Sequence, residues 1–238
     1  MLASAMVLFA GIAAVTLTST TGGGPASPAP STTSAAAALG ATPTPQPSPT
    51  SRATPPAWVD WQFAGATLTA PEAGIDHAEI HELRPNEIVT KTSTDASGTT
   101  VTYSAIEPDD KHTIAWDSQV VDGVRQPVGS VLSASAANTV YLYCHDYRDG
   151  TALCSTISDV TAPGDEITLE TPTEVLTYAA VETFEERKNE ISSDPRVTMA
   201  APGRLLIITC NSAGERDTAG EPTVNTVLVF QLVASRAP

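Results

Sequence analysis

Two side chains of this 238-residue chain are of the types that perform nucleophilic chemistry together. Cys210 ends the most apolar stretch, Arg204–Cys210, and a polar loop follows it directly. His145 lies in a similar place, after the apolar run Asn138–Cys144 and before another polar loop. An imidazole near a thiol accepts its proton or lowers its pKa, which activates the sulfur as a nucleophile. Cys210 and His145 are 65 positions apart, so they meet only if their two segments are neighbouring strands.

The cysteine count bears on the state of that thiol. The chain has three cysteines, Cys144, Cys154 and Cys210. An odd number in an exported protein allows at most one internal disulfide and leaves one thiol over. From position alone, Cys210 is either a nucleophile held at a strand end or a small buried hydrophobic residue. Both interpretations stay open at this point.

The elements that must position these residues are short strands. Hydrophobicity in residues 58–238 alternates mostly with a period of two, and Gly- and Pro-based turn signals separate the alternating segments. The predicted strands are Thr99–Ile106, Asn138–Cys144, Glu166–Thr171, Val175–Val181, Arg204–Cys210 and Thr226–Val233. The continuous apolar character of Arg204–Cys210 predicts that this strand is buried on both faces.

Helical periodicity is scarce in the same region. The best candidate is the short segment Glu182–Ile191, whose glutamates predict a solvated helix face. Several short strands without helical crossovers favour a closed barrel or a sandwich. We therefore predict that residues 58–238 form one all-β (mainly) domain with one or two short helices.

The first 57 residues differ in composition, with a single charged side chain, Arg52, and nine of the nineteen prolines. Residues 1–17 include an uncharged apolar run, which predicts either a retained membrane anchor or a cleaved signal segment. The run is short and no basic side chain precedes it, so we expect the natural reading frame to begin upstream. Residues 18–57 are rich in Pro, Ser, Thr and Ala, which predicts a disordered linker that holds an exported domain away from the membrane.

The charge of the predicted domain excludes one class of function. Residues 58–238 hold all 27 acidic residues and eleven of the twelve basic ones, a net charge of −16. An acidic surface repels phosphate backbones. The sequence therefore predicts no nucleic-acid partner.

Short motifs around the two candidate catalytic residues resemble those of one enzyme family. Leu205–Cys210 (LLIITC) is similar to a Leu-x-Leu-Ile-Thr-Cys strand, and Cys144-His145-Asp146 to a Gly-His-Val-Asp segment. These are the nucleophile and histidine motifs of the sortases, and the resemblance is strongest to the class F sortases of high-GC Gram-positive bacteria. In this alignment His145 falls on the family's catalytic histidine.

Weaker matches extend the resemblance over roughly residues 66–233. Leu68–Ile75 resembles the family's first-strand pattern, and Ala162–Glu166 its Pro-Gly-Asp turn. Trp116 and Pro127 fall where the family has a tryptophan and then a Pro-Gly pair. The order and spacing of these matches imply a closed eight-stranded sortase-like β-barrel.

The resemblance also implies an activity, that of an extracellular, membrane-anchored cysteine transpeptidase. Cys210 would attack a Leu-Pro-x-Thr-Gly-type sorting signal and form an acyl-enzyme, and His145 would serve as the acid and base. The implied partners are surface proteins that carry the signal and an amine acceptor of the cell-wall precursor or pilin type. No cofactor is required; calcium, which carboxylates bind in some family members, is not indicated.

One family residue has no counterpart. The family carries a catalytic arginine on the strand after the nucleophile, and the alignment puts Asn225 in its place; Arg216, in the preceding loop, is the nearest arginine. Loss of one oxyanion donor typically adds about 2.7–4 kcal/mol to the barrier. The resemblance makes Asn225, Thr209 and Arg216 the candidates for holding the substrate or the oxyanion. The alternative function is a sortase-fold surface binding or assembly module that has lost catalysis.

Cys144 is the second departure, because it stands where the family has a glycine before the histidine. Cys144 and Cys154, ten residues apart, either form a disulfide across the loop that His145 opens or are two small buried hydrophobic residues. A disulfide between Cys144 and Cys210, which would make a redox-gated enzyme, is a third alternative.

Overall fold

The structure of the chain is a computed structural model, described here for residues 63–94, 97–121 and 124–238. The predicted apolar segment 1–17 and linker 18–57 lie outside the described residues, as does the predicted domain start at residue 58. Within the described ranges, none of the helices has the length and apolar character needed to cross a membrane.

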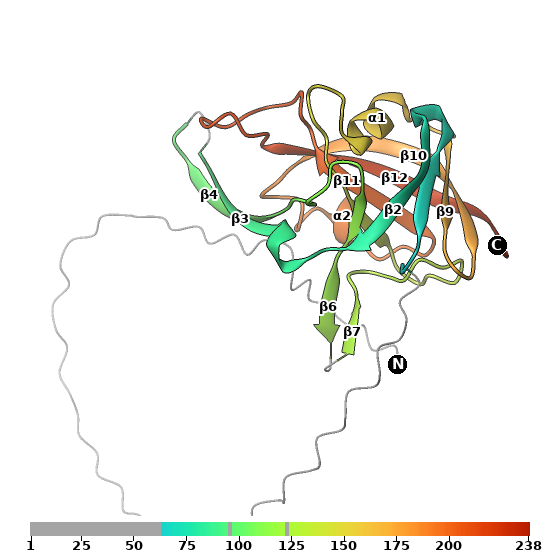
Figure 1. The fold of residues 1–238 in the computed structure, drawn as a ribbon. Coiled ribbons are helices and arrows are strands. Elements are labelled where there is room, and N and C mark those ends of the chain that lie inside the picture. The colour runs from blue at the N-terminus through green and yellow to red at the C-terminus, as the bar shows by residue number, and fades with distance from the viewer. Residues whose placement is uncertain (1–62, 95–96, 122–123) are drawn as a thin grey trace, which may run out of the picture.

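Eight strands close into a barrel (Figure 1). Their order around the barrel is β1 (Thr67–Ala70), β2 (Ile75–Glu82), β5 (Ile114–Trp116), β8 (Val140–Tyr143), β11 (Arg204–Cys210), β12 (Val224–Arg236), β10 (Val175–Arg187) and β9 (Glu166–Glu170), which pairs again with β1. The pairs β2–β5 and β8–β11 are parallel, and the other neighbours are antiparallel. The predicted closed, mainly β, eight-stranded fold is confirmed.

Two hairpins and two helices complete the described part of the chain. β3 (Ile88–Thr94) pairs with β4 (Thr100–Ile106), and β6 (Ser118–Val121) pairs with β7 (Val124–Pro127). The helices are α1 (Leu153–Val160) and α2 (Pro195–Thr198), and two 3-10 turns span Pro71–Ala73 and Pro85–Glu87. The predicted strand Thr99–Ile106 thus forms β4, in a hairpin outside the barrel.

The predicted helix Glu182–Ile191 is wrong. Residues 182–187 continue β10, and turns follow from Lys188 onward. β10 and β12 are both 13 residues long, and the ladder between them extends to the pair Arg187–Val224. Backbone pairing along that ladder outweighs the local helical pattern, because strand formation depends more on tertiary context than on intrinsic preference.

Alternating side chains along the strands form two hydrophobic clusters. One cluster has members on all eight barrel strands and fills the interior, among them Leu68, Leu142, Leu205 and Phe230. The other lies on the outer face of one sector and includes Tyr141, Tyr143, Leu206, Ile208, Val227 and Val229. β11 contributes to both clusters, so it is buried on both faces as predicted.

The outer cluster is covered by segments from elsewhere in the chain. Ile191 and Val197 lie in the connection between β10 and β11, and Ile106 is at the end of β4. Successive side chains of a strand point to opposite faces, so Cys210 faces outward like Ile208, two residues before it. The nucleophile candidate is therefore on the covered outer face of the barrel.

Substitution of Gly129 tests the packing of this face. Gly129 has a φ of +85°, and a Cβ there would lie 2.2 Å from the Thr139 carbonyl oxygen and 2.6 Å from the Tyr141 ring. Gly98 also has a φ of +85° but has nothing within 4 Å of the same point, so it is a matched control. We expect Gly98→Ala to lower the free energy of unfolding by about 1–2 kcal/mol, the cost of a left-handed backbone. Gly129→Ala should lose about 1–3 kcal/mol more because of the clash. Equal losses in urea unfolding would contradict this packing.

Candidate active site

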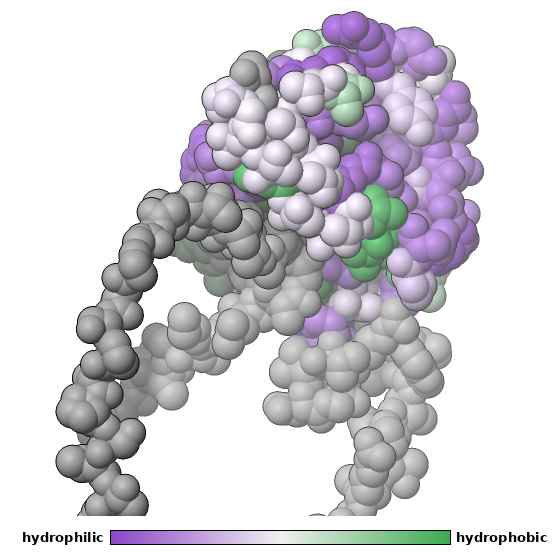
Figure 2. All heavy atoms as spheres, turned by 90° about the vertical axis from the view of Figure 1, so that its left-hand side faces the viewer, coloured by the Kyte–Doolittle hydropathy of each residue, from purple (hydrophilic) through white to green (hydrophobic). Residues whose placement is uncertain are grey.

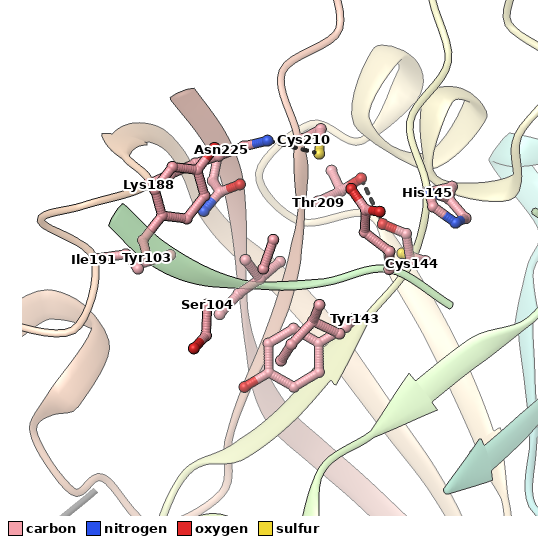
Figure 3. A pocket seen from close by; sticks show the side chains of 14 residues that line it. Tyr103, Ser104, Tyr143, Cys144, His145, Lys188, Ile191, Thr209, Cys210 and Asn225 are labelled. Atoms are coloured by element: carbon pink, nitrogen blue, oxygen red, sulfur yellow. Dashed lines mark hydrogen bonds between the residues drawn. The ribbon is translucent and has the colours of Figure 1, made fainter. Parts of the chain in front are cut away.

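The strand register brings Cys210 and His145 together. β11 pairs in parallel with β8, and Ile208 is the register partner of Tyr143. Two residues further along each chain are Cys210 and His145, which both line one cavity (Figure 3). The condition set by the sequence, that the two strands adjoin, is met.

Hydrogen bonds continue this pairing beyond the ends of the strands. Thr209 Oγ1 donates to the Cys144 carbonyl oxygen at 2.8 Å, and Cys144 N donates to the Ile208 carbonyl oxygen at 3.3 Å. The Asp146 carboxylate then accepts from both the backbone N and the Oγ of Ser212, each at 3.0 Å. The loops that follow His145 and Cys210 are thus tied to each other, which fixes the relative positions of the two side chains.

A disulfide joins Cys144 to Cys154, the first of the pairings considered from the sequence. Both residues are buried, and Cys154 N also donates to the His145 carbonyl oxygen at 3.1 Å. The covalent link therefore holds the N-terminal end of α1 against the residue that precedes His145. Cys210 is a free, half-buried thiol, so the Cys144–Cys210 pairing is not the one found.

His145 is oriented by a backbone carbonyl. Its Nε2 lies 2.5 Å from the Pro108 carbonyl oxygen, and its ring packs against Tyr147 with a centroid distance of 5.1 Å. A carbonyl oxygen only accepts hydrogen bonds, so Nε2 must carry a hydrogen. In the neutral ring Nδ1 is then the nitrogen without a hydrogen, and it has a free acceptor lone pair.

Lys188 is the site residue that sequence analysis missed. Its Nζ donates to Cys210 Sγ at 3.3 Å, and the side chain is only 8% exposed. Figure 3 shows the Lys188 side chain reaching past Asn225 toward the sulfur. The acidic run around Lys188 predicts an exposed helix, whereas Lys188 is a buried residue in the turn that directly follows the mostly exposed end of β10.

Of the other predicted residues, two line the cavity and one does not. Asn225 is the register partner of Cys210 on β12. Thr209 is 2% exposed, and its hydroxyl hydrogen is used in the bond to Cys144. The Arg216 guanidinium donates to the carbonyl oxygens of Ser212 and Gly220, so it braces its own loop and is not among the residues that line the cavity.

The β3–β4 hairpin supplies one wall of the cavity. Tyr103, Ser104, Ala105 and Ile106, all on β4, line it, and Tyr103 is 4% exposed. Burial raises the pKa of the Tyr103 hydroxyl; Lys91 opposes the rise, whereas negative charge at Cys210 adds to it. The hairpin thus places an un-ionised phenol close to Cys210 at neutral pH.

Contacts of β3 with the loop between β11 and β12, and with Glu107 after β4, hold the hairpin in place. Lys91 forms ion pairs with Glu107 and Glu221, and Thr218 N donates to the Thr94 carbonyl oxygen at 3.2 Å. Burial alone would lower the pKa of Lys91, but the two glutamates outweigh it and raise that pKa. Figure 1 shows the outer ends of β3 and β4 beside the loop between β11 and β12. From that side, the visible surface is mostly pale or purple with small green areas (Figure 2).

A second cleft of about 490 Å³ lies nearby and is largely polar, with Asp146, Glu185, Asn211 and Thr226 in its lining. Glu185 is next in sequence to Glu186, and Thr226 is next to Asn225, and both Glu186 and Asn225 point outward. The side chains of Glu185 and Thr226 therefore point to the opposite face of the sheet, where this cleft lies.

Across residues 63–94, 97–121 and 124–238, no group of three or more His, Cys, Asp or Glu side chains is placed to hold a metal ion.

The sequence matches no family model and no curated protein. The following three solved structures that match the chain are sortases. Listeria monocytogenes sortase A is 16% identical with a TM-score of 0.44, over 73% of this chain and 89% of that one. Sortase E1 from Streptomyces coelicolor with a tripeptide in the active site is 13% identical with a TM-score of 0.44, over 72% and 89%. The SrtA sortase from Actinomyces oris is 11% identical with a TM-score of 0.45, over 72% and 81%.

Peptide mapping without reduction tests the assignment of the three cysteines. We expect the Cys144 and Cys154 peptides to be found linked and Cys210 to be the thiol that iodoacetamide labels. The double variant Cys144→Ala/Cys154→Ala should lose about 2–4 kcal/mol of unfolding free energy, the typical contribution of a disulfide. An unlinked Cys144 peptide from the untreated protein would refute the pairing.

Proposed function

We propose that this chain is a sortase-type cysteine transpeptidase. The observation that carries the proposal is the arrangement around Cys210: a half-buried thiol in a cavity, with a buried ammonium 3.3 Å from its sulfur and a histidine on the adjacent strand end. A thiol beside a cation and an imidazole is activated as a nucleophile. The sequence motifs around Cys210 and His145 support the same activity.

The first half of the reaction forms an acyl-enzyme. The Cys210 thiol transfers its proton to His145, and the thiolate attacks the scissile carbonyl carbon of the substrate. A C–S bond forms while the carbonyl π electrons move onto oxygen. When the tetrahedral intermediate collapses, the C–N bond breaks and the departing amine takes the proton from His145. The acyl group then remains on Cys210 as a thioester.

The second half transfers the acyl group to an amine. His145 accepts a proton from the incoming amine as its nitrogen attacks the thioester carbonyl. Collapse of this second intermediate breaks the C–S bond and restores the Cys210 thiolate. Atoms and charges balance with no cofactor, so the chemistry requires only the chain, a peptide donor and an amine acceptor.

The lining of the cavity fits an apolar donor residue. Beside the catalytic groups, the lining side chains are largely apolar: Tyr103, Ala105, Ile106, Tyr143, Ile191 and Ile208. Burial of a leucine-sized side chain against such a surface contributes about 1.5–3 kcal/mol. This supports a Leu-Pro-x-Thr-Gly-type signal as the donor.

The biological setting follows from the same proposal. The donors are surface proteins that carry a sorting signal, and the acceptor is an amine of the cell-wall precursor or pilin type. The enzyme acts at the extracellular face of the membrane, held there by the apolar residues 1–17 or released if they are cleaved. Calcium is not part of the proposed chemistry.

Intact-mass measurement tests the proposed reaction. The full chain is incubated with a panel of Leu-Pro-x-Thr-Gly peptides without an acceptor amine, beside Cys210→Ala. We expect the mass of the wild-type chain to increase by that of the acyl fragment and the mass of the variant to stay unchanged. His145→Gln should form the adduct about 10²–10⁴-fold more slowly, the usual contribution of a general acid–base group.

Exposed His112, in the loop between β4 and β5, provides the matched control, and His112→Gln should react like the wild type. If no peptide of the panel gives an adduct, the transpeptidase proposal fails. A surface binding or assembly module would then be the better account.

A further inference from the structure

We propose that Lys188 is a catalytic residue that supplies, from a different strand, the positive charge that an arginine would supply at the position of Asn225. The proposal deepens the proposed function, since it assigns a role within the same reaction. Lys188 contacts the reacting atom directly, with Nζ 3.3 Å from Cys210 Sγ.

The strand register explains how Lys188 reaches the sulfur. Cys210 pairs with Asn225 on β12, and Asn225 pairs with Glu186 on β10, so these three side chains point to the same face of the sheet. Lys188 lies two residues beyond Glu186, and its backbone N donates to the Thr223 carbonyl oxygen at 3.0 Å. It therefore shares that face and lies diagonal to Asn225, a spacing that long side chains bridge.

The burial of Lys188 strengthens the effect of its ammonium on the Cys210 sulfur. Lys188 is 8% exposed, and an ammonium group removed from water is costly unless a negative charge or good acceptors surround it. The Cys210 sulfur provides such a partner when it is ionised. The positive charge of Lys188, largely shielded from solvent, and the negative charge of the thiolate therefore stabilise each other.

The nearby arginines are engaged elsewhere. Arg187 is half-exposed and pairs with Glu215, and Arg196 pairs with Asp194 and Glu186. Arg216 donates to carbonyl oxygens of its own loop. Among the described residues that line the cavity, Lys188 is the only lysine or arginine.

The same charge acts at two stages of the reaction. Before attack, the ammonium stabilises the negative charge that forms on the Cys210 sulfur when its proton moves to His145. Once the C–S bond has formed, the negative charge has moved from sulfur to the carbonyl oxygen of the substrate, and the ammonium donates a hydrogen bond to that oxyanion. Lys188 gains and loses no proton in either half-reaction, because His145 carries out the proton transfers.

Three variants of the full chain test the proposal. Lys188→Met removes the charge but keeps an apolar side chain of similar length, and Lys188→Arg keeps the charge. Arg187→Met removes the neighbouring charge, which faces solvent and pairs with Glu215, and serves as the matched control. Thermal unfolding of each variant verifies that the barrel is folded.

The first readout is the rate of Cys210 alkylation by iodoacetamide from pH 5.5 to 9.5. We expect Lys188→Met to react about tenfold or more slowly at pH 7, with its pH profile displaced to higher pH, because a cation beside a thiol favours the thiolate. Lys188→Arg should remain within about threefold of the wild type, and Arg187→Met within about twofold. An unchanged profile in folded Lys188→Met would overturn the proposal.

The second readout is the rate of acylation by the Leu-Pro-x-Thr-Gly peptides. We expect Lys188→Met to lose a further factor of about 10²–10³ beyond its loss in alkylation, because the oxyanion also loses its donor. A loss no larger than that in alkylation would overturn the oxyanion role.

The two readouts separate this proposal from the proposed function. If the wild type alkylates quickly and Lys188→Met slowly, but no peptide acylates either, the ion pair is supported and the transpeptidase assignment fails. If the wild type forms the acyl adduct and Lys188→Met does so at the same rate, the transpeptidase stands and the assignment of Lys188 is overturned.

Discussion

The parallel pairing of β8 with β11 is the constraint on which the candidate active site depends. Cys210 and His145 are 65 residues apart and come together because Tyr143 and Ile208 are register partners. A shift of one residue would turn the side chains of either strand to the other face of the barrel. The bonds from Thr209 to Cys144 and from Ser212 to Asp146 hold the register at the open ends of the strands, where ladders otherwise fray.

The long β10–β12 ladder adds the positive charge. β12 pairs with β11 on one side and with β10 on the other. It therefore lies between the strand that ends at Cys210 and the strand that Lys188 directly follows. Residues of β4, in the hairpin with β3, then line the cavity that also holds Cys210 and Lys188. Because Lys188 is largely shielded from solvent, the attraction between its ammonium and a negative charge on the sulfur is stronger than it would be in water. In our proposal, Lys188 thereby supplies beside Cys210 the positive charge that Asn225 does not carry.

The sequence predicted most of the barrel strands and the two strand-end residues, Cys210 and His145, that the structure brings to one cavity, because alternating strands and strand-end polar residues leave a clear local pattern. Arg204–Cys210 was predicted to the residue. The sequence did not reveal Lys188, because it lies at the end of a strand whose formation depends on the distant partner β12. Arg216 was a candidate by proximity in sequence, but only the structure shows its guanidinium bound to loop carbonyls. Register across a sheet is a long-range property, and local periodicity does not specify it.

The central claim is that the fold turns Cys210 into an activated nucleophile. The most direct test compares iodoacetamide alkylation at pH 7 of the native protein and of the same protein unfolded in urea with its disulfide intact. Cys210 is the one thiol outside the disulfide, so the label reports on it alone. An ordinary thiol is only about 3% ionised at this pH. The account predicts that native Cys210 reacts about tenfold or more faster than the unfolded thiol. An equal or slower native rate would contradict it.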